Sequence, residues 1–486
     1  MLLTTGHWPL TTGTITGSPQ TLNHALVGRG KPALAATQSK GIKLVEHSDQ
    51  HVDTRTLGIL AFSATAGVLV EFYDFFIYGY AAASAFPHVF FPTLSPTVAL
   101  VLSYLAFGAG FPARILGAFI FGHYGDRTGR KFAFLINIMI VGASTCLVGL
   151  LPGYATLGIA APLLLLLLRV VQGIGLGGEF GGASSLLAEF GSHRKHRAFW
   201  MSLANLGIPL GAVAASAAMF MLSKSFRTGG WRVAMLLSLV IVIPALLARY
   251  KLADSPLFER LKQKEQLAKM PSFTVFKKYS RPIFLLALVS AFQQMDGYVS
   301  GTYIITFHRL AGIPLATTAV IIMCSRIGDV LGVGLSGPLS DLLKRRKAAL
   351  LAIIGTFGIS YPLVLAILAR NIPMCILTQF LITLFGIGIL HGLAPILTAE
   401  SFPTKFRYSG TGISYSISAV MGGMIAPPVL AGLIGQDALH NWHYVIIVYG
   451  IYAAIAMVAL VFIRETRDLD LGELDRSEEK SAVTGA

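Results

Sequence analysis

The chain has 486 residues, of which 54% are hydrophobic and only 13% are charged, with a formal net charge of +15 and a mean hydropathy of +0.68. Soluble globular proteins have a charged fraction of about 25%, so this composition excludes an ordinary soluble fold and indicates a polytopic membrane protein. The positive charge lies in short loops between apolar runs and forms no single basic face, which argues against a nucleic-acid partner.

The chain begins with a polar segment and continues with apolar runs. Residues 1–56 are rich in Thr, Gly and Ser and lack the basic, apolar and cleavage regions of a secretory signal, so we expect a cytoplasmic tail there. Each later run of about 20 apolar residues is long enough to cross a bilayer as a helix. We expect twelve transmembrane helices, at 57–80, 97–121, 131–151, 161–187, 199–222, 231–250, 282–306, 315–337, 348–369, 373–398, 409–434 and 443–464.

Lys and Arg are distributed unevenly between the loops. They gather after the even-numbered helices, whereas the loops at 81–96, 151–160 and 435–441 contain none. Because basic loops stay in the cytoplasm, we expect both termini inside. The predicted domains are an N-terminal tail at 1–56, a six-helix bundle at 57–250, a cytoplasmic linker at 251–281 with a surface helix near 256–269, a second six-helix bundle at 282–464 and a cytoplasmic tail at 465–486.

A polar segment from Gly122 to Lys131 separates the second and third runs and reads Gly-His-Tyr-Gly-Asp-Arg-Thr-Gly-Arg-Lys. Its glycines and its four charges do not fit in hydrocarbon, so we expect a tight polar hairpin at the membrane surface. A degenerate copy runs from Gly337 to Lys347, with Asp341 in the place of Asp126. The chain therefore resembles two related halves in parallel.

Ionisable residues inside the first two predicted helices are candidate functional residues, because placing each such side chain at the bilayer centre costs about 2.5–3.5 kcal/mol. Glu71 and Asp74 are three residues apart on one helical face, beside Tyr73, and a carboxylate pair in a semi-dry cavity suits a proton carrier. Arg114 is the only charge in the second helix. It could clamp a substrate carboxylate with two hydrogen bonds or pair structurally with Glu71 or Asp74.

The fourth helix contains Arg169 and Gln172 followed by a glycine-rich stretch with Glu179. No strand precedes the glycines, which argues against a dinucleotide-binding loop, and close packing between helices is the simpler interpretation. The second half has further polar positions in its helices: Gln293, Gln294, Asp296 and Tyr298, the pair Arg326 and Asp329, and His391. Arg326 and Asp329 are spaced to neutralise one another, and His391 is interpreted as a packing residue.

The hairpin from Gly122 to Lys131 resembles the signature loop of the major facilitator superfamily of transporters. Arg169-Val-Val-Gln172-Gly173 resembles its fourth-helix motif, whose arginine is associated with proton coupling. Together with Glu71-Phe-Tyr-Asp74-Phe and Phe111-Pro-Ala-Arg114, these motifs resemble the metabolite:proton symporter family, over Leu57 to about Arg467. Two features depart from the superfamily patterns: Gly207-Ile-Pro209 only partly matches an antiporter motif, and no Arg follows Asp341.

The resemblance implies an all-α major facilitator fold of two six-helix bundles and a proton-coupled symporter that imports a small organic acid by alternating access. We expect a monomer in the inner membrane without metal or cofactor. The alternative substrate is a zwitterion such as betaine or proline; a membrane enzyme and a transporter-like sensor are remote alternatives. The candidate residues are Arg114, Arg169, Gln172, Tyr73, Gln293, Gln294 and Tyr298 for substrate, Glu71, Asp74, Glu179 and Asp296 for protons, and Gly122, Asp126, Arg127, Gly129, Arg130 and Asp341 for a conformational gate.

Overall fold

The computed structural model describes the backbone of residues 54–128, 130–177, 205–250, 271–403 and 407–467, and this part of the chain is helical without a strand. Side chains at 54–64, 122–135, 245–250, 271–274, 399 and 407–408 are not described. Several predictions therefore fall outside the described residues: most of the two tails, the surface helix near 256–269, Glu179, Gly129, and the side chains of Asp126, Arg127 and Arg130.

The first half of the chain forms the helices that precede residue 251, where η denotes a π-helical turn. They are α1 (Thr54–Ser84), α2 (Phe86–Val89), α3 (Pro96–Gly108), α4 (Gly110–Thr128), α5 (Arg130–Leu150), α6 (Tyr154–Leu157), α7 (Ala160–Leu176), α10 (Gly207–Met221), η1 (Phe226–Gly230), α11 (Trp231–Leu236) and α12 (Ser238–Tyr250).

The second half forms α14 (Pro271–Lys278), α15 (Ser280–Tyr298), η2 (Val299–Tyr303), α16 (Ile304–Leu310), α17 (Leu315–Leu343), α18 (Arg345–Leu368), α19 (Ile372–Ile382), η3 (Thr383–Ile389), α20 (Leu390–Ser401), α21 (Arg407–Ala419), η5 (Val420–Met424), α22 (Ala426–Ile434), α23 (Ala438–Asn441) and α24 (His443–Phe462).

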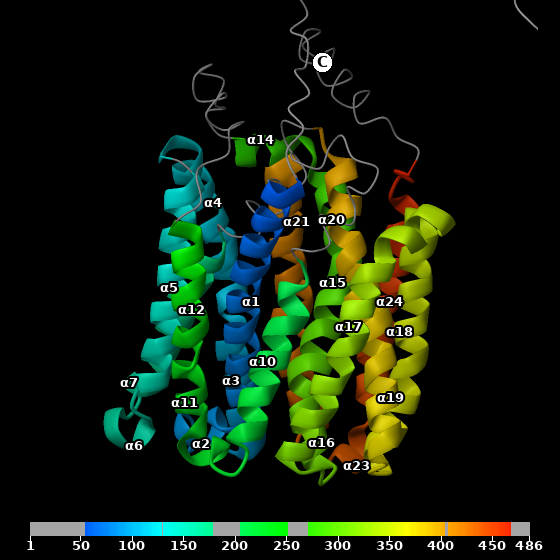
Figure 1. Ribbon diagram of the computed structural model, residues 1–486. Helices are drawn as coiled ribbons and strands as arrows, with labels where there is room; N and C mark the ends of the chain where they lie inside the picture. The colour runs from blue at the N-terminus through cyan, green and yellow to red at the C-terminus, as the bar shows by residue number, and fades with distance from the viewer. Residues whose placement is uncertain (1–53, 129, 178–204, 251–270, 404–406, 468–486) are drawn as a thin grey trace, which may run out of the picture. The chain divides into compact units, whose positions relative to one another are not determined.

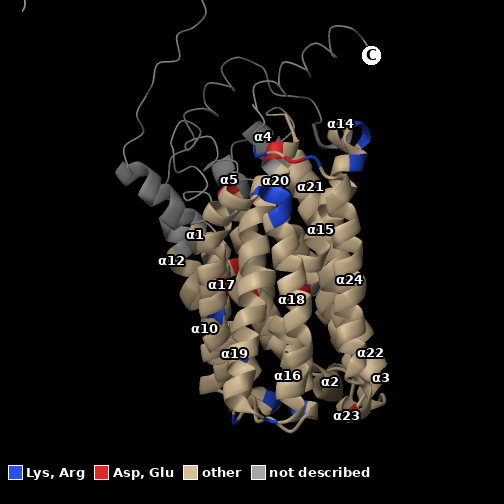
Figure 2. Cartoon of the chain, turned by 90° about the vertical axis from the view of Figure 1, so that its right-hand side faces the viewer, with Lys and Arg blue, Asp and Glu red and all other residues tan. Residues whose placement is uncertain are grey.

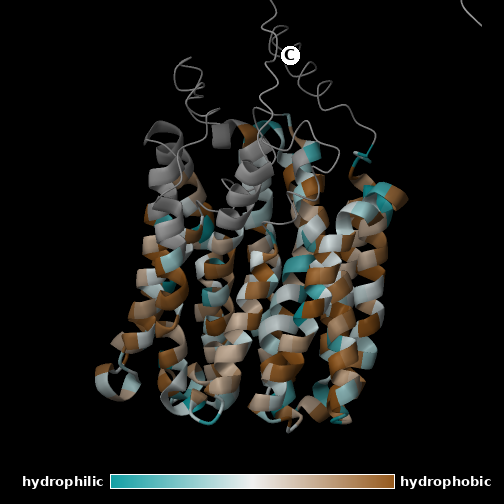
Figure 3. Ribbon diagram, viewed as in Figure 1, coloured by the Kyte–Doolittle hydropathy of each residue, from teal (hydrophilic) through white to brown (hydrophobic). Residues whose placement is uncertain are grey.

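The helices have the length and the surface of membrane spans. Among the described residues, eight helical stretches are long and apolar enough to cross a bilayer, and three shorter apolar helices lie at Ile136–Leu150, Ala160–Leu176 and Gly207–Met221. With α1, these overlap the twelve predicted runs, of which 178–187 in the fourth and 199–204 in the fifth lie outside the described residues. Large apolar side chains are exposed along them, and Figure 3 shows brown residues over the length of the helices. Examples are Leu163, Leu167, Ile354 and Val458.

Most helices run side by side between two ends of the bundle (Figure 1). One end holds α14, and the other holds α2, α6, α16 and α23; we call them the α14 end and the α2 end. Figure 2 shows Lys, Arg, Asp and Glu mainly at these ends, with a few charges at mid-height. The helices of each half pack mostly on one another, and the halves meet where α10 packs on α17 and where α3 and α4 pack on α22 and α21.

The polar segment after Phe121 differs from the predicted hairpin. Helix α4 continues to Thr128 and α5 begins at Arg130, so the described residues on both sides of position 129 are helical. The prediction of a loop over the whole segment was wrong, because a polar sequence that extends beyond the hydrocarbon can remain helical. The degenerate copy at Gly337–Lys347 is also mostly helical. Helix α17 continues to Leu343, and only Lys344, with φ at 75°, separates it from α18.

Glycines bring α4 and α7 close together. A Cβ at Gly117 would collide with the backbone carbonyl of Ile174, and one at Gly173 would collide with the backbone of Gly110. The glycine-rich run of the fourth helix is thus a packing surface as far as Gly177, as the sequence predicts. This close approach sets Arg114 on α4 and Arg169 on α7 within the same core.

Candidate functional site

Arg114 and Glu71 form a buried ion pair between α4 and α1. The Nη2 of Arg114 lies 2.7 Å from Oε1 of Glu71, and the two side chains are 3% and 1% exposed. The guanidinium also lies over the ring of Tyr415 from α21, with 5.4 Å between Cζ and the ring centroid. The structural pairing that the sequence left open is therefore present, with Glu71 as the partner.

Arg169 on α7 is enclosed by aromatic rings. Its Cζ lies 4.5 Å, 4.4 Å and 4.8 Å from the ring centroids of Phe75, Tyr78 and Phe107. Its Nε donates to the backbone oxygen of Phe107 at 2.9 Å, and its Nη1 donates to Oε1 of Gln172. Its Nη2 has no hydrogen-bond partner although the residue is fully buried. A desolvated cation with a free donor is suited to binding an anion.

A chain of hydrogen bonds connects Arg169 to Asp74. Beyond the bond to Gln172, the Nε2 of Gln172 donates to the hydroxyl of Thr145 at 2.7 Å, and that hydroxyl donates to Oδ2 of Asp74 at 2.8 Å. Asp74 is 1% exposed, and its Oδ1 has no partner. Thr145 was missed by the sequence analysis, because one Thr in an apolar helix gives no signal of its partners.

Of the predicted substrate residues on α15, Tyr298 lies within electrostatic range of both Arg114 and Arg169. The ring of Tyr298 packs on Phe75, Phe107 and Phe111, with centroids 5.0–5.9 Å apart, and so joins the two halves. Tyr73 differs, since its hydroxyl donates to the carbonyl of Ala234 on α11 at 2.7 Å. Tyr73 therefore connects helices of the first half.

Gln293 and Gln294 are buried on the same helix. The Nε2 of Gln293 lies 3.3 Å from Nδ1 of His391 on α20, and the Oε1 of Gln293 has no partner. Gln294 interacts with Tyr415, and its Nε2 has no partner. The ring of His391 also meets Phe72 edge-on at 6.3 Å. Unsatisfied buried amides are rare, and these two offer free donor and acceptor atoms to a ligand.

Asp296, Arg326 and Asp329 lie elsewhere in the second half. The hydroxyl of Tyr449 on α24 donates to Oδ1 of Asp296 at 2.7 Å. Arg326 Nη1 lies 3.6 Å from Oδ2 of Asp329, so the predicted pair is present. We call these four residues the α15–α17 cluster.

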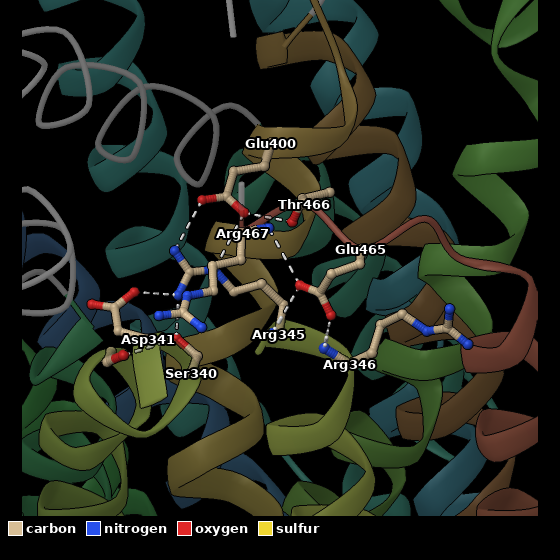
Figure 4. A network of polar contacts seen from close by, with 9 residues as sticks. Ser340, Asp341, Arg345, Arg346, Glu400, Glu465, Thr466 and Arg467 are labelled. Atoms are coloured by element: carbon tan, nitrogen blue, oxygen red, sulfur yellow. Dashed lines mark hydrogen bonds and ion pairs between the residues drawn. The ribbon is translucent and has the colours of Figure 1, made fainter. Parts of the chain in front are cut away.

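Figure 4 shows a polar network at the α14 end of the second half. Arg345 at the start of α18 lies 2.6 Å from Asp341 on α17 and 3.2 Å from Glu400 on α20. Glu465 accepts the backbone N–H groups of Arg345 and Arg346 at 3.0 Å and 3.1 Å, which caps α18. Asp341 thus joins neighbouring helices, and the corresponding side chains of the Gly122–Lys131 segment lie outside the described residues.

The halves are joined near the α2 end by Tyr104 of α3. Its hydroxyl lies 2.9 Å from the hydroxyl of Thr306 on α16, and its ring is 5.7 Å from that of Tyr303. Thr306 in turn donates to the carbonyl of Ala83 on α1 at 3.5 Å. These contacts separate the central arginines from the α2 end.

Comparison with known proteins agrees with this architecture. The model of the Major Facilitator Superfamily matches residues 59–427 and 312–484. The "Inner membrane metabolite transport protein YhjE" of Escherichia coli is 34% identical over 88% of this chain and 98% of its own length. The "Shikimate transporter" of the same organism is 30% identical over 80% of this chain and 90% of its own length.

A third relative and a solved structure extend the comparison. The "Proline/betaine transporter" of Escherichia coli is 30% identical and covers 84% of each chain. The crystal structure of a D-xylose-proton symporter superposes with a TM-score of 0.65 at 17% identity, over 85% of this chain and 98% of that one, which supports the fold alone. The relatives and the fold are those of transporters and not of enzymes. The chain is a multi-pass membrane protein that belongs to the Major Facilitator Superfamily and, within it, to the metabolite:proton symporter family.

Proposed function

We propose that this metabolite transporter imports a small organic acid together with protons, by alternating access between its two halves. The observation that carries the proposal is the pair of buried arginines, Arg114 and Arg169, each next to a buried carboxylate or a hydrogen-bond chain that ends in one. Burial of a cation in the membrane costs several kcal/mol, so a buried arginine indicates a function, and binding of an anion is the simplest one.

In this proposal the substrate carboxylate takes the place of Glu71 in the ion pair with Arg114. A substrate carboxylate can replace Glu71 at the guanidinium only if Glu71 gives up its charge, since two carboxylates beside one cation repel each other. Protonation of Glu71 therefore favours substrate binding, and substrate binding favours protonation. Such mutual dependence is the thermodynamic requirement for symport.

Asp74 is the second proton carrier in this proposal. Its connection through Thr145 and Gln172 to Arg169 lets a change of its charge reach the second arginine through hydrogen bonds. Gln172, Gln293, Gln294 and Tyr298 are assigned to substrate contacts, while Tyr73 is assigned to a supporting role through Ala234. Glu179 and Asp296 remain predicted proton carriers.

The protein is proposed to lie in the inner membrane, with the α14 end and both termini on the cytoplasmic side. The basic loops after the even-numbered helices support this orientation. The cytoplasmic gate is assigned to Gly122, Asp126, Arg127, Gly129, Arg130 and Asp341. The domain boundaries at 57–250 and 282–464 and the monomeric state are part of the same proposal.

A zwitterionic substrate is the second candidate, favoured by the aromatic rings at the centre. Phe75, Phe107, Phe111 and Tyr298 form a contiguous group, and aromatic faces attract quaternary ammonium groups. The relatives of this chain include a shikimate transporter and a proline/betaine transporter, each 30% identical to it. The two buried cations, Arg114 and Arg169, favour the organic acid over the zwitterion.

Uptake into proteoliposomes tests the proposal. Radiolabelled shikimate and betaine are offered with an inward pH gradient, with and without a protonophore. We expect accumulation of the acid that the protonophore abolishes. Uptake of betaine without uptake of shikimate would establish the zwitterionic substrate. Accumulation that is unchanged by the protonophore would exclude proton coupling.

Two substitutions assign the roles. Arg114→Lys keeps the charge but loses the planar fork, so affinity for the acid should fall about 10- to 100-fold, which corresponds to a charged hydrogen bond of about 1.5–3 kcal/mol. Glu71→Gln imitates the protonated acid, so exchange of substrate should persist while gradient-driven accumulation is lost. Unchanged affinity in Arg114→Lys would assign Arg114 to structure.

A further inference from the structure

The α15–α17 cluster holds more acid than base. Asp296, Arg326 and Asp329 are each 0% exposed. Asp296 is within electrostatic range of both α17 residues. If both carboxylates were ionised, the cluster would carry one uncompensated negative charge in the membrane interior, at a cost of several kcal/mol.

The neighbouring helices supply no described second cation to the cluster. Tyr449 of α24 bonds to Asp296, and Tyr80 of α1 lies near Arg326; both are neutral phenols. His391 of α20 and Tyr415 of α21 also pack on α15, but they contact Gln293 and Gln294 instead. The excess charge is therefore removed most simply by one proton.

Two carboxylate oxygens of the cluster are available to bind that proton. The Oδ2 of Asp296 and the Oδ1 of Asp329 have no hydrogen-bond partner. The backbone around them is tight, because a Cβ at Gly386 would collide with Asp296, and one at Gly301 would lie 3.1 Å from Nη2 of Arg326. These glycines belong to η3 and η2, and π-helical turns are frequent at functional sites.

Arg326 also contacts the other half of the molecule. Its Cζ lies 4.9 Å from the ring centroid of Phe76 on α1, two residues after Asp74. Movement of α17 relative to α1 would change this contact, and with it the balance of charge between Arg326 and the two carboxylates. The cluster is therefore placed to respond to the motion of the halves.

We propose that Asp296 and Asp329, which both interact with Arg326, form a second proton-binding site that takes up and releases one proton in each transport cycle. The site is separate from Glu71 and Asp74 and lies wholly in the second half. Its role in the cycle rests on the proposed proton coupling, whereas the binding of the proton can be tested without any substrate.

Infrared pH-difference spectra of the purified protein in lipid test proton binding directly, because a protonated carboxyl group absorbs apart from a carboxylate. The proposed carriers Glu71 and Asp74 also contribute to a protonated-carboxyl band, so the test compares each variant with the wild type. We expect Asp296→Asn and Asp329→Asn each to lose one component of the wild-type band, since either leaves Arg326 with one ionised partner. Asp341→Asn, at an exposed side chain of the α14 end, is the matched control and should keep the band.

A band that is undiminished in either cluster variant overturns the proposal. Should one amide variant fail to fold, Tyr449→Phe offers a second readout. It removes the bond to Asp296 and should shift the pH at which the band titrates. An unshifted band in Tyr449→Phe would likewise contradict the assignment to Asp296.

The coupling ratio tests the role in the cycle, with shikimate as the probe. At a pH difference of one unit and no membrane potential, each coupled proton supports about tenfold accumulation. Asp296→Asn and Asp329→Asn should therefore accumulate about tenfold less shikimate than the wild type, with exchange retained. Unchanged accumulation overturns the second coupling site. If the wild type accumulates no acid at all, the proposed function fails, while the infrared result still decides whether the cluster binds a proton.

Discussion

At the scale of the residue, Thr145 shows how one hydroxyl organises the candidate site. It accepts from Gln172 and donates to Asp74, so it joins the proposed carrier to the arginine of α7. Thr145→Val keeps the shape of the side chain but leaves both partners buried and unsatisfied. We expect a loss of about 1–3 kcal/mol of stability, visible as a lower Tm in detergent, and reduced proton-driven uptake.

Thr145→Ser is the matched control, because it retains the hydroxyl. It should keep most of both properties. If Thr145→Val matched the wild type in Tm and in uptake, the hydrogen-bond chain would have no role in stability or coupling.

At the scale of the element, the start of α18 depends on a residue from the end of the chain. Burial acts to raise the pKa of Glu465, but bonds from the backbone N–H groups of Arg346, Arg467, Arg345 and Thr466 outweigh it, so the pKa lies below its ordinary value. The carboxylate therefore stabilises the fold at pH values above the unfolded pKa, and this contribution is lost as pH falls through the folded pKa.

Glu465→Gln should lower the Tm at neutral pH, by the equivalent of about 0.5–2 kcal/mol for a lost helix cap. The difference from the wild type should shrink as the pH falls below the unfolded pKa of about 4.3, and it should disappear once the pH is also below the lowered folded pKa. Arg464→Gln, at the neighbouring exposed position, is the control and should leave the Tm unchanged. A pH-independent difference would mean that packing, not charge, makes the contribution.

At the scale of the whole molecule, Tyr104 joins the two halves near the α2 end. Its hydroxyl meets Thr306, and this contact must break if that end opens during alternating access. Tyr104→Phe should shift the population toward the state open at the α2 end. Labelling of a cysteine introduced at Ala83 by a membrane-impermeant thiol reagent should then become several-fold faster.

The control for this experiment is Tyr303→Phe. Tyr303 stacks on the same ring, but its hydroxyl donates to the carbonyl of Leu430 within its own half. Its loss should leave the labelling rate near that of the wild type. Equal acceleration in both variants would indicate general loosening of the bundle instead of a specific seal.

The sequence by itself determined the membrane class, the twelve helices and the family, since run length, loop charge and the motifs around Asp126 and Arg169 are local properties. The same reasoning placed a loop from Gly122 to Lys131, where the helices instead continue to Thr128 and from Arg130. Polarity defines where a helix leaves hydrocarbon, but it does not end the helix.

Only the tertiary structure decided which polar side chains meet. Spacing allowed Arg114 to pair with Glu71 or with Asp74. In the folded bundle Arg114 of α4 reaches Glu71 of α1, while α5 provides Thr145 to Asp74. Tyr449 is 153 residues from Asp296, and no periodicity links them. Contacts between distant helices depend on how close the glycines let them approach and on how each helix is rotated, and these are properties of the packed bundle.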